Sequence, residues 1–140
     1  TAWLSQAIKG KVITIEGNPQ LSELAKRKLE NNGIDSVTFI NGSFSEHLEK
    51  TLQKAKNPWL VYVDGDHTEK GTLSYFETLC RHAEQDCMIV FDDLYWSREM
   101  AQAWKKVVED KRTPLSVDFF HFGVVFFRFQ QLKQHFLLRK

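Results

Sequence analysis

The sequence predicts an α/β protein whose sheet is mostly parallel and whose C-terminal part forms an antiparallel hairpin. Short runs that are apolar on both faces alternate with amphipathic segments, which is typical of parallel strands covered by helices on both sides. The last third differs, because seven of the 11 Phe residues lie between Phe119 and Phe136. No linker, internal repeat or low-complexity tract interrupts the chain, so residues 1–140 are expected to form a single domain.

The first half of the chain predicts two strand–helix pairs. Residues 12–15 are β-branched throughout and stop at Glu16-Gly17, as a buried strand would. Asn18 can cap the following helix, with Pro19 in its first turn and Gly33 at its end. A second strand is expected at 37–40, and a capping box over 43–46 begins the next helix.

The second half predicts two more parallel strands and the hairpin. The strands 59–63 and 87–91 are each followed by a helix, capped by Thr68 and Ser97 respectively. The runs 116–122 and 123–129 leave no room for a crossover helix, so they should pair antiparallel. We interpret the Phe cluster as core and sheet edge in preference to a ligand-binding surface, and we assign no element to residues 130–140.

Composition narrows the classes of function. The 140 residues carry 19 Lys and Arg against 18 Asp and Glu, and a formal charge of +1 argues against a dedicated nucleic-acid binder. No apolar run is long enough to span a bilayer, which argues against a membrane protein. Two cysteines, Cys80 and Cys87, cannot make a disulfide framework, so we expect a cytoplasmic location. The sequence gives no indication of oligomeric state.

Acidic residues follow three of the four predicted parallel strands. In an open parallel sheet, ligands bind outside the carboxyl ends of the strands. Glu16, Asp64 and the pair Asp92-Asp93 stand at such ends, and Asp66 and His67 come directly after Asp64. Each acid has an alternative role as a helix cap, where the macrodipole favours negative charge. Together they would repel one another unless a cation or ligand offsets their charge.

Glu16, His67 and Ser43 each have a structural interpretation and a functional one. An acid after an early strand of a nucleotide-binding fold suits a ribose diol, because its two oxygens accept both hydroxyl protons, and Glu16 has this position. His67 is either a helix-start or surface residue or part of the site. Ser43 is a helix cap first, with a ligand contact only incidental.

These residues and their order carry a family resemblance. The segments 61–67, Val-Tyr-Val-Asp-Gly-Asp-His, and 89–93, Ile-Val-Phe-Asp-Asp, resemble those of class I S-adenosylmethionine-dependent methyltransferases. Within that class the chain is similar to the O-methyltransferases that use a divalent metal. The Ile15-Glu16-Gly17 turn supports the resemblance, which extends from about residue 12 to residue 128.

The resemblance implies a function and a set of site residues. It implies methyl transfer from S-adenosylmethionine to a hydroxyl of a small-molecule acceptor, in a Rossmann-like fold. The implied cofactor-binding residues are Glu16, Gly17, Ser43, Phe44 and Asp64, although Ser43 stands where the family commonly has Asp. The implied ligands for Mg²⁺ are Asp64, Asp92 and Asp93, and the implied proton acceptors are Asp66 and His67.

The N-terminus departs from the family pattern. The family begins with a strand and a glycine-rich loop, whereas residues 1–8 here resemble only the end of the helix that follows that loop. In the family's strand order, 3-2-1-4-5-7-6, the first strand is central, so we expect this chain to be a fragment of a longer protein. Two other functions stay open: an NAD-dependent dehydrogenase, which explains Glu16 but not the acids at 64, 92 and 93, and a non-catalytic Rossmann-like binding module.

Overall fold

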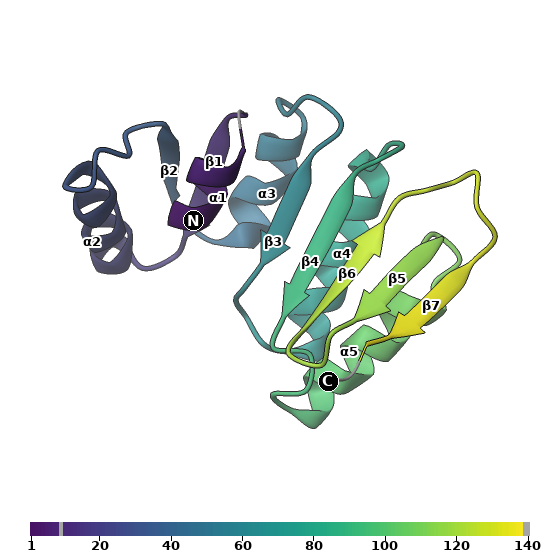
Figure 1. Ribbon diagram of the computed structural model, residues 1–140. Helices are drawn as coiled ribbons and strands as arrows, with labels where there is room; N and C mark the ends of the chain where they lie inside the picture. The colour runs from purple at the N-terminus through teal and green to yellow at the C-terminus, as the bar shows by residue number, and fades with distance from the viewer. Residues whose placement is uncertain (9, 139–140) are drawn as a thin grey trace. The chain divides into compact units, whose positions relative to one another are not determined.

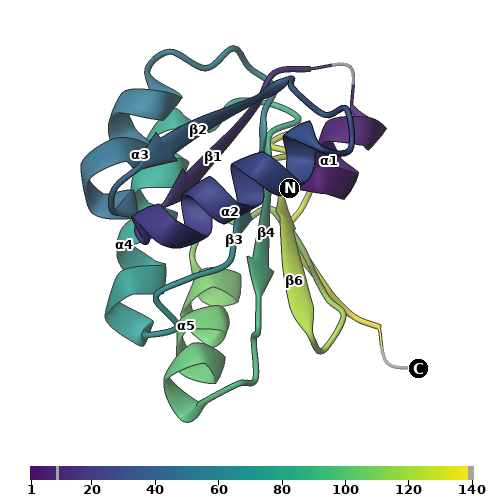
Figure 2. The ribbon, with the colours of Figure 1, turned by 90° about the vertical axis from the view of Figure 1, so that its left-hand side faces the viewer.

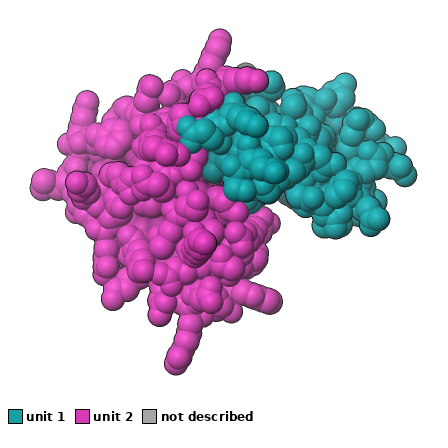
Figure 3. Space-filling model, turned by 180° about the vertical axis from the view of Figure 1, so that it is seen from behind, with its two compact units in different colours: residues 1–51 teal, residues 52–140 magenta. Residues whose placement is uncertain are grey.

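The computed structural model describes residues 1–8 and 10–138. These divide into two compact units, residues 1–51 and residues 52–140, which are coloured separately in Figure 3. The expectation of a single domain stays a prediction.

The first unit contains one parallel strand pair and its connecting helix. Its elements are α1 (Ala2–Ala7), β1 (Val12–Glu16), α2 (Pro19–Glu30), β2 (Val37–Asn41) and α3 (Phe44–Leu52), whose last residue belongs to the second unit. β1 and β2 pair in parallel from Val12↔Val37 to Glu16↔Asn41, so their carboxyl ends lie at the same edge. This pairing requires a crossover, which α2 supplies.

The helix starts in this unit follow the caps expected from the sequence. The Asn18 side chain accepts hydrogen bonds from the backbone N–H groups of Gln20 and Leu21. The Ser43 hydroxyl accepts from the Glu46 N–H at 3.3 Å, and the Glu46 carboxylate accepts from the Ser43 N–H at 3.3 Å. The capping box is therefore confirmed, and both oxygens involved satisfy groups at the start of α3.

The second unit contains a five-stranded sheet. Its elements are β3 (Leu60–Val63), α4 (Glu69–His82), β4 (Met88–Asp92), α5 (Arg98–Glu109), β5 (Leu115–Asp118), β6 (Phe122–Phe126) and β7 (Gln134–Leu137). The strand order is β3-β4-β6-β5-β7, with β6 antiparallel to both of its neighbours. The orders found in the two units match the 3-2 and 4-5-7-6 portions of the expected order, and the described residues contain no counterpart of its first strand.

Both helices of the second unit lie on the same face of its sheet (Figures 1 and 2). The expectation of helices on both sides concerns the whole parallel sheet and stays a prediction. The reason for the one-sided arrangement in this unit is topological. β3 to β4 and β4 to β5 are both crossovers between parallel strands, and both advance in the same direction across the sheet. Right-handed crossovers in one direction place their helices on one face.

The core of this unit lies between the sheet and the two helices. Phe91 on β4 is 1% exposed and packs between Phe76 of α4 and Trp104 of α5, with ring centroids 6.3 Å apart in each pair. Gly123 on β6 allows this packing, because a Cβ atom there would lie 2.6 Å from the Trp104 ring. The indole is thereby held against the backbone of the hairpin.

The C-terminal hairpin is confirmed, but its turn lies earlier than expected. β5 and β6 pair antiparallel, with Asp118 opposite Gly123, and the turn takes residues 119–121 from the run expected to be the first strand. Asp118 determines this turn, since its side chain accepts a hydrogen bond from the Phe120 N–H at 2.8 Å. The sequence analysis also missed β7, which pairs in parallel with β5.

The interpretation of the Phe cluster as core and sheet edge holds for only part of it, which includes Phe136 on the edge strand β7. Phe127 is 1% exposed and lies in the core. Five others of the seven are substantially exposed: Phe119, Phe120, Phe122, Phe129 and Phe136. The shift of the turn is the physical reason for the first three, because it places them in or beside a loop.

Candidate active site

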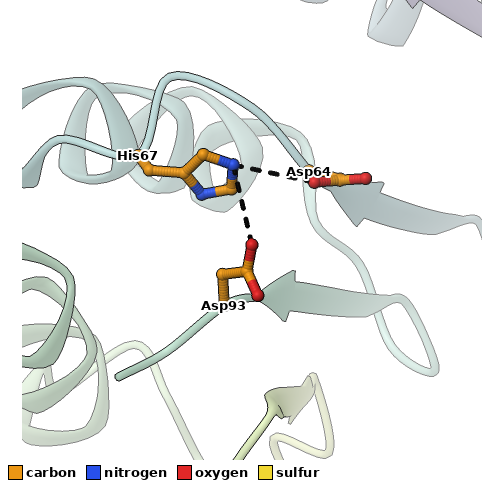
Figure 4. A group of neighbouring side chains, drawn as sticks. All are labelled: Asp64, His67 and Asp93. Carbon is orange, nitrogen blue, oxygen red and sulfur yellow. Dashed lines mark ion pairs between the residues drawn. The ribbon is translucent and has the colours of Figure 1, made fainter. Parts of the chain in front are cut away.

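Two carboxylates and an imidazole converge at the carboxyl ends of β3 and β4. Asp64 follows β3, Asp93 follows β4, and His67 lies in the loop before α4. His67 Nε2 lies 3.8 Å from Asp64 Oδ1 and 3.9 Å from Asp93 Oδ2. Figure 4 shows the imidazole directed toward both acids. One ligand atom from each residue lies within 4.8 Å of the other two.

The strand pairing and the loop backbone produce this convergence. β3 and β4 are paired in parallel through Val63↔Phe91, so the next residues along each chain emerge side by side. Asp66 and Asp93 adopt φ values of +49° and +52°, the left-handed region that Asp tolerates better than most residues. The chain therefore turns sharply at both strand ends.

Asp92 accepts two hydrogen bonds from its neighbours. Its Oδ2 accepts a hydrogen bond from the Tyr62 hydroxyl at 2.6 Å, and its Oδ1 accepts from the Asp93 N–H at 2.9 Å. Burial, this hydrogen bond and the surrounding acids all raise the pKa of Tyr62, so its phenol stays a donor at neutral pH. The structure therefore groups His67, and not Asp92, with Asp64 and Asp93.

Two neighbouring hydroxyl groups donate hydrogen bonds to Asp66. Its Oδ2 accepts from the Tyr75 hydroxyl at 3.0 Å, and its Oδ1 accepts from the Thr68 hydroxyl at 3.3 Å. Burial and the bond to Asp66 raise the pKa of Tyr75 to about 12. Gly71 leaves space for this carboxylate, since a Cβ there would overlap Asp66 Oδ2. Asp66 thus packs over the first turn of α4.

His67 buries one ring nitrogen and directs the other toward the two acids. Its Nδ1 is buried, and among side-chain atoms of the described residues it is the one buried nitrogen or oxygen found without a hydrogen-bond partner. Its Nε2 faces the two acids.

The same group of residues fits a divalent cation held by oxygen. Carboxylates supply the hard oxygen ligands that Mg²⁺ prefers, with waters completing its coordination. A histidine that ligates a metal usually donates its other ring N–H to a partner, and the Nδ1 of His67 lacks one. The donors that fit Mg²⁺ are therefore Asp64 and Asp93.

The first unit carries the remaining predicted site residues. Glu16 ends β1, is half-buried, and accepts the Asn18 N–H at 2.8 Å through Oε1. Gly17 is exposed and lines a shallow, open hollow with Asn18, Pro19 and Gln20. Ser43 and Phe44 begin α3 beyond the end of β2. Glu16 at the end of β1 pairs with Asn41 at the end of β2, and Ser43 follows Asn41 by two residues. Glu16 and the start of α3 therefore lie at the same edge of this strand pair.

Sequence reasoning missed Tyr62 as a residue of the site. Tyr62 lies inside the apolar run 59–63, where an aromatic residue is indistinguishable from core. Its hydroxyl reaches Asp92, which is 30 positions further along the chain. One feature of the sequence could have indicated it: Tyr62 stands two residues before Asp64, and residues two apart along a strand point to the same side.

The fold is that of the class I S-adenosylmethionine-dependent methyltransferases. A family model described as a methyltransferase domain matches residues 1–94, and the chain belongs to this family. Among curated proteins, none matches the sequence significantly.

Solved structures with the same fold are distant in sequence. The cofactor-bound protein Rv0187 from MTB is 20% identical with a TM-score of 0.71, over 91% of this chain and 66% of that one. A suspected O-methyltransferase from Klebsiella pneumoniae is 16% identical with a TM-score of 0.68, over 91% of this chain and 67% of that one. The O-methyltransferase from Bacillus cereus, solved with SAH, is 14% identical with a TM-score of 0.67, over 89% and 67%. The chain thus spans about two thirds of the length of these proteins.

None of the helices within residues 1–8 and 10–138 is long and apolar enough to cross a bilayer.

Proposed function

We propose that the protein containing this chain transfers a methyl group from S-adenosylmethionine to a hydroxyl of a small-molecule acceptor. The observation that carries the proposal is the convergence of Asp64, His67 and Asp93 at a strand edge of a chain from the methyltransferase family. The cofactor-bound and SAH-bound neighbours support the choice of methyl donor. A cytoplasmic location is part of the same proposal.

The reaction is an in-line displacement at the sulfonium methyl carbon. A bond forms between the acceptor oxygen and the methyl carbon, while the carbon–sulfur bond breaks and its electron pair stays on sulfur. Positioning of the two reactants supplies much of the acceleration. The acceptor hydroxyl must also lose its proton, so the site needs a group that takes it.

His67 takes that proton at Nε2. The carboxylates of Asp64 and Asp93, each within 4.0 Å of Nε2, stabilise the resulting imidazolium. Asp64 and Asp93 would alternatively hold a divalent cation, which would lower the pKa of the hydroxyl and orient it, and the two carboxylates would then no longer stabilise an imidazolium. Tyr62 holds Asp92 in place through its hydrogen bond, and Asp93 is turned toward His67.

Glu16 is proposed to accept the hydroxyl protons of the cofactor ribose. Replacing it by Gln removes the charge and half of the acceptor capacity while preserving shape. Calorimetric titration of the intact protein with S-adenosylhomocysteine should show Glu16→Gln binding roughly 10- to 150-fold more weakly, the equivalent of about 1.5–3 kcal/mol. Glu23→Gln is the matched control, because Glu23 lies on the surface of α2 and pairs with Arg27.

Two results would contradict the proposal. An unchanged affinity of Glu16→Gln for S-adenosylhomocysteine would remove Glu16 from the cofactor site. Tight binding of NADH by the unmodified protein, without binding of S-adenosylhomocysteine, would favour a dehydrogenase and overturn methyl transfer.

The cation is tested by binding as well as by activity. Titration with Mn²⁺, followed by electron paramagnetic resonance, should show a site that Mg²⁺ competes for and that Asp93→Asn weakens by at least about tenfold. Asp86→Asn is the control, since Asp86 is a loop aspartate with a similar positive φ of +69°. Equal Mn²⁺ binding by the two variants would mean that the acids bind no cation.

A further inference from the structure

The last strand, β7, lies at the edge of the five-stranded sheet, and β5 is its one neighbouring strand within the described part of the chain. Figure 1 shows β7 as the outermost strand, beside β5. All four residues of β7 are exposed, whereas β5 buries Ser116 and Asp118. An edge strand of this kind can accept a further strand, because its backbone is already extended.

The hydrogen bonds to β5 show which backbone groups of β7 point outward. The N–H groups of Gln134 and Leu138 donate to backbone carbonyls at the two ends of the β5 segment, at 2.9 Å and 2.8 Å. Because these groups alternate in direction along a strand, His135 and Leu137 direct their N–H and C=O groups away from β5. The outer edge of β7 therefore offers donors and acceptors in the spacing that a partner strand requires.

The side chains at this edge are apolar on both faces of the sheet. Phe136 lies opposite Val117 and is 47% exposed, and Leu137 lies opposite Asp118 and is 60% exposed. Successive residues of a strand point to opposite faces. A strand added to β7 would thus cover apolar surface on both faces, in addition to pairing with the backbone.

The sequence around β7 is basic. Residues 128–140 contain four Lys and Arg and no Asp or Glu. One of these charges is compensated, since Arg128 forms an ion pair with Asp86 at 3.0 Å. The segment as a whole therefore favours a partner with negative charge.

Lys133 places one of these charges directly before β7. Its ammonium group donates to the backbone carbonyl of Asp110, a neutral acceptor, at 2.6 Å. The carboxylate of Asp110 is held by two hydrogen bonds from the Arg112 guanidinium, at 3.0 Å and 2.8 Å. Lys133 is thus fixed at the start of the edge strand, where an acidic side chain of a partner strand can reach it.

A second copy of this chain fits the edge less well than an acidic partner. Pairing two β7 strands would bring two basic segments together, and like charges on neighbouring strands are destabilising. Lysine beside an edge strand is also one of the means by which proteins prevent such pairing.

We propose that the outer edge of β7 binds an extended acidic segment of a partner protein, which adds to the sheet as a further strand. The backbone of the partner pairs with His135 and Leu137, and its Asp or Glu side chains lie near Lys133. β7 and β3 are at opposite ends of the strand order, and the candidate active site follows β3 and β4, so this inference does not depend on the proposed function.

The test compares three synthetic peptides. The probe is fluorescein-labelled Glu-Glu-Val-Thr-Val-Thr-Glu-Glu, and the first control has Lys in place of each Glu. The second control is the probe N-methylated at two consecutive central residues, which removes a donor from each edge of the peptide and keeps its charge. Fluorescence anisotropy with the intact protein should show the probe binding at least about tenfold more tightly than either control.

Several results of this comparison would overturn the proposal. Equal binding of the probe and the N-methylated peptide would show attraction between charges without strand addition. Equal binding of the Glu and Lys peptides would remove charge as the basis of selection. Absence of probe binding would show that the edge accepts no acidic strand.

Variants and amide exchange locate the binding. Lys133→Glu should weaken probe binding about three- to tenfold. Lys54→Glu makes the same change of charge at an exposed turn residue after α3, and it should alter binding by less than about twofold. In NMR, the probe should slow the exchange of the His135 and Leu137 amides. An equal loss in both variants, or binding without this protection, would overturn the proposal.

The free protein supplies the remaining test. Without the probe, the amides of His135 and Leu137 should exchange rapidly, because they face solvent. Protection of both amides in the free protein would overturn the proposal, and sedimentation would then identify the occupant. A dimer would indicate a second copy on this edge, and a monomer would indicate another segment of the same protein.

Discussion

Asp118→Asn is expected to destabilise the protein strongly, because this buried carboxylate organises the hairpin and the loop after β4. Asp118 is 0% exposed, and its Oδ2 accepts from the Tyr95 hydroxyl at 2.5 Å and from Trp104 Nε1 at 3.1 Å. Its Oδ1 accepts from the Phe120 N–H at 2.8 Å. Asparagine offers a single acceptor oxygen, so it cannot accept from the Phe120 N–H and also from the Tyr95 and Trp104 side chains.

The magnitude follows from these bonds. Leaving one buried donor unsatisfied costs about 1–3 kcal/mol, and the bonds that survive fall from the charged to the neutral range, a loss of about 1 kcal/mol each. The substitution also removes a buried carboxylate, and the desolvation cost that disappears with it offsets part of this loss. We therefore expect a net decrease of about 2–4 kcal/mol in the free energy of unfolding.

Urea denaturation followed by circular dichroism measures this change. With a slope of roughly 2 kcal/mol per molar urea, the midpoint should fall by about 1–2 M. Asp86→Asn is the control, because Asp86 forms an exposed ion pair with Arg128 at 3.0 Å, and such pairs contribute at most about 1 kcal/mol. A midpoint for Asp118→Asn within error of this control would refute the reasoning.

Two other predictions concern the packing and the charges of the second unit. Gly123→Ala should lower the free energy of unfolding by about 1–3 kcal/mol, because its Cβ would lie 2.6 Å from the Trp104 ring; unchanged stability in urea would contradict the tight packing. Arg112→Gln should cost up to about 1 kcal/mol at neutral pH, where the hydrogen bond from Arg112 lowers the pKa of the partly exposed Asp110. A lowered folded-state pKa stabilises the fold above the ordinary value near pH 4, and that contribution is lost as pH falls through the folded value, so the difference between variant and parent should shrink in acid. A difference that is constant from pH 7 to pH 2 would contradict this.

Elements fixed by local signals could be predicted from the sequence. The caps at Asn18, Thr68 and Ser97 all begin helices, and each side chain accepts a hydrogen bond from the backbone of the first turn. Two-faced apolar runs gave β3 and β4 to within a residue or two of their observed bounds. The caps depend on residues two or three positions apart, and the strands depend on contiguous apolar runs, so a single sequence displays both.

Elements that depend on distant partners could not be predicted. The turn at 119–121 depends on Asp118 being buried against Tyr95 and Trp104, contacts that span 23 and 14 positions. β7 exists because it pairs with β5, where the Ser116 hydroxyl and the His135 ring meet at 2.9 Å. The sequence of β7 shows no run that would separate it from a loop.

In the candidate site, too, some features could be predicted from the sequence and others could not. The order of strands and acids predicted that Asp64 and Asp93 would lie at one edge, and the two are within reach of a common imidazole. The hydrogen bonds that engage Asp92 and Asp66 come from Tyr62 and Tyr75, and tertiary structure alone shows them. The roles proposed for Asp92 as a metal ligand and Asp66 as a base stay predictions.

The most direct test of the central claim is a crystal structure of the intact protein with S-adenosylhomocysteine. The account predicts that the cofactor's sulfur faces the group formed by Asp64, His67 and Asp93. Cofactor density elsewhere on the protein, or a sulfur facing away from these three side chains, would contradict the assignment of this strand edge as the site of methyl transfer.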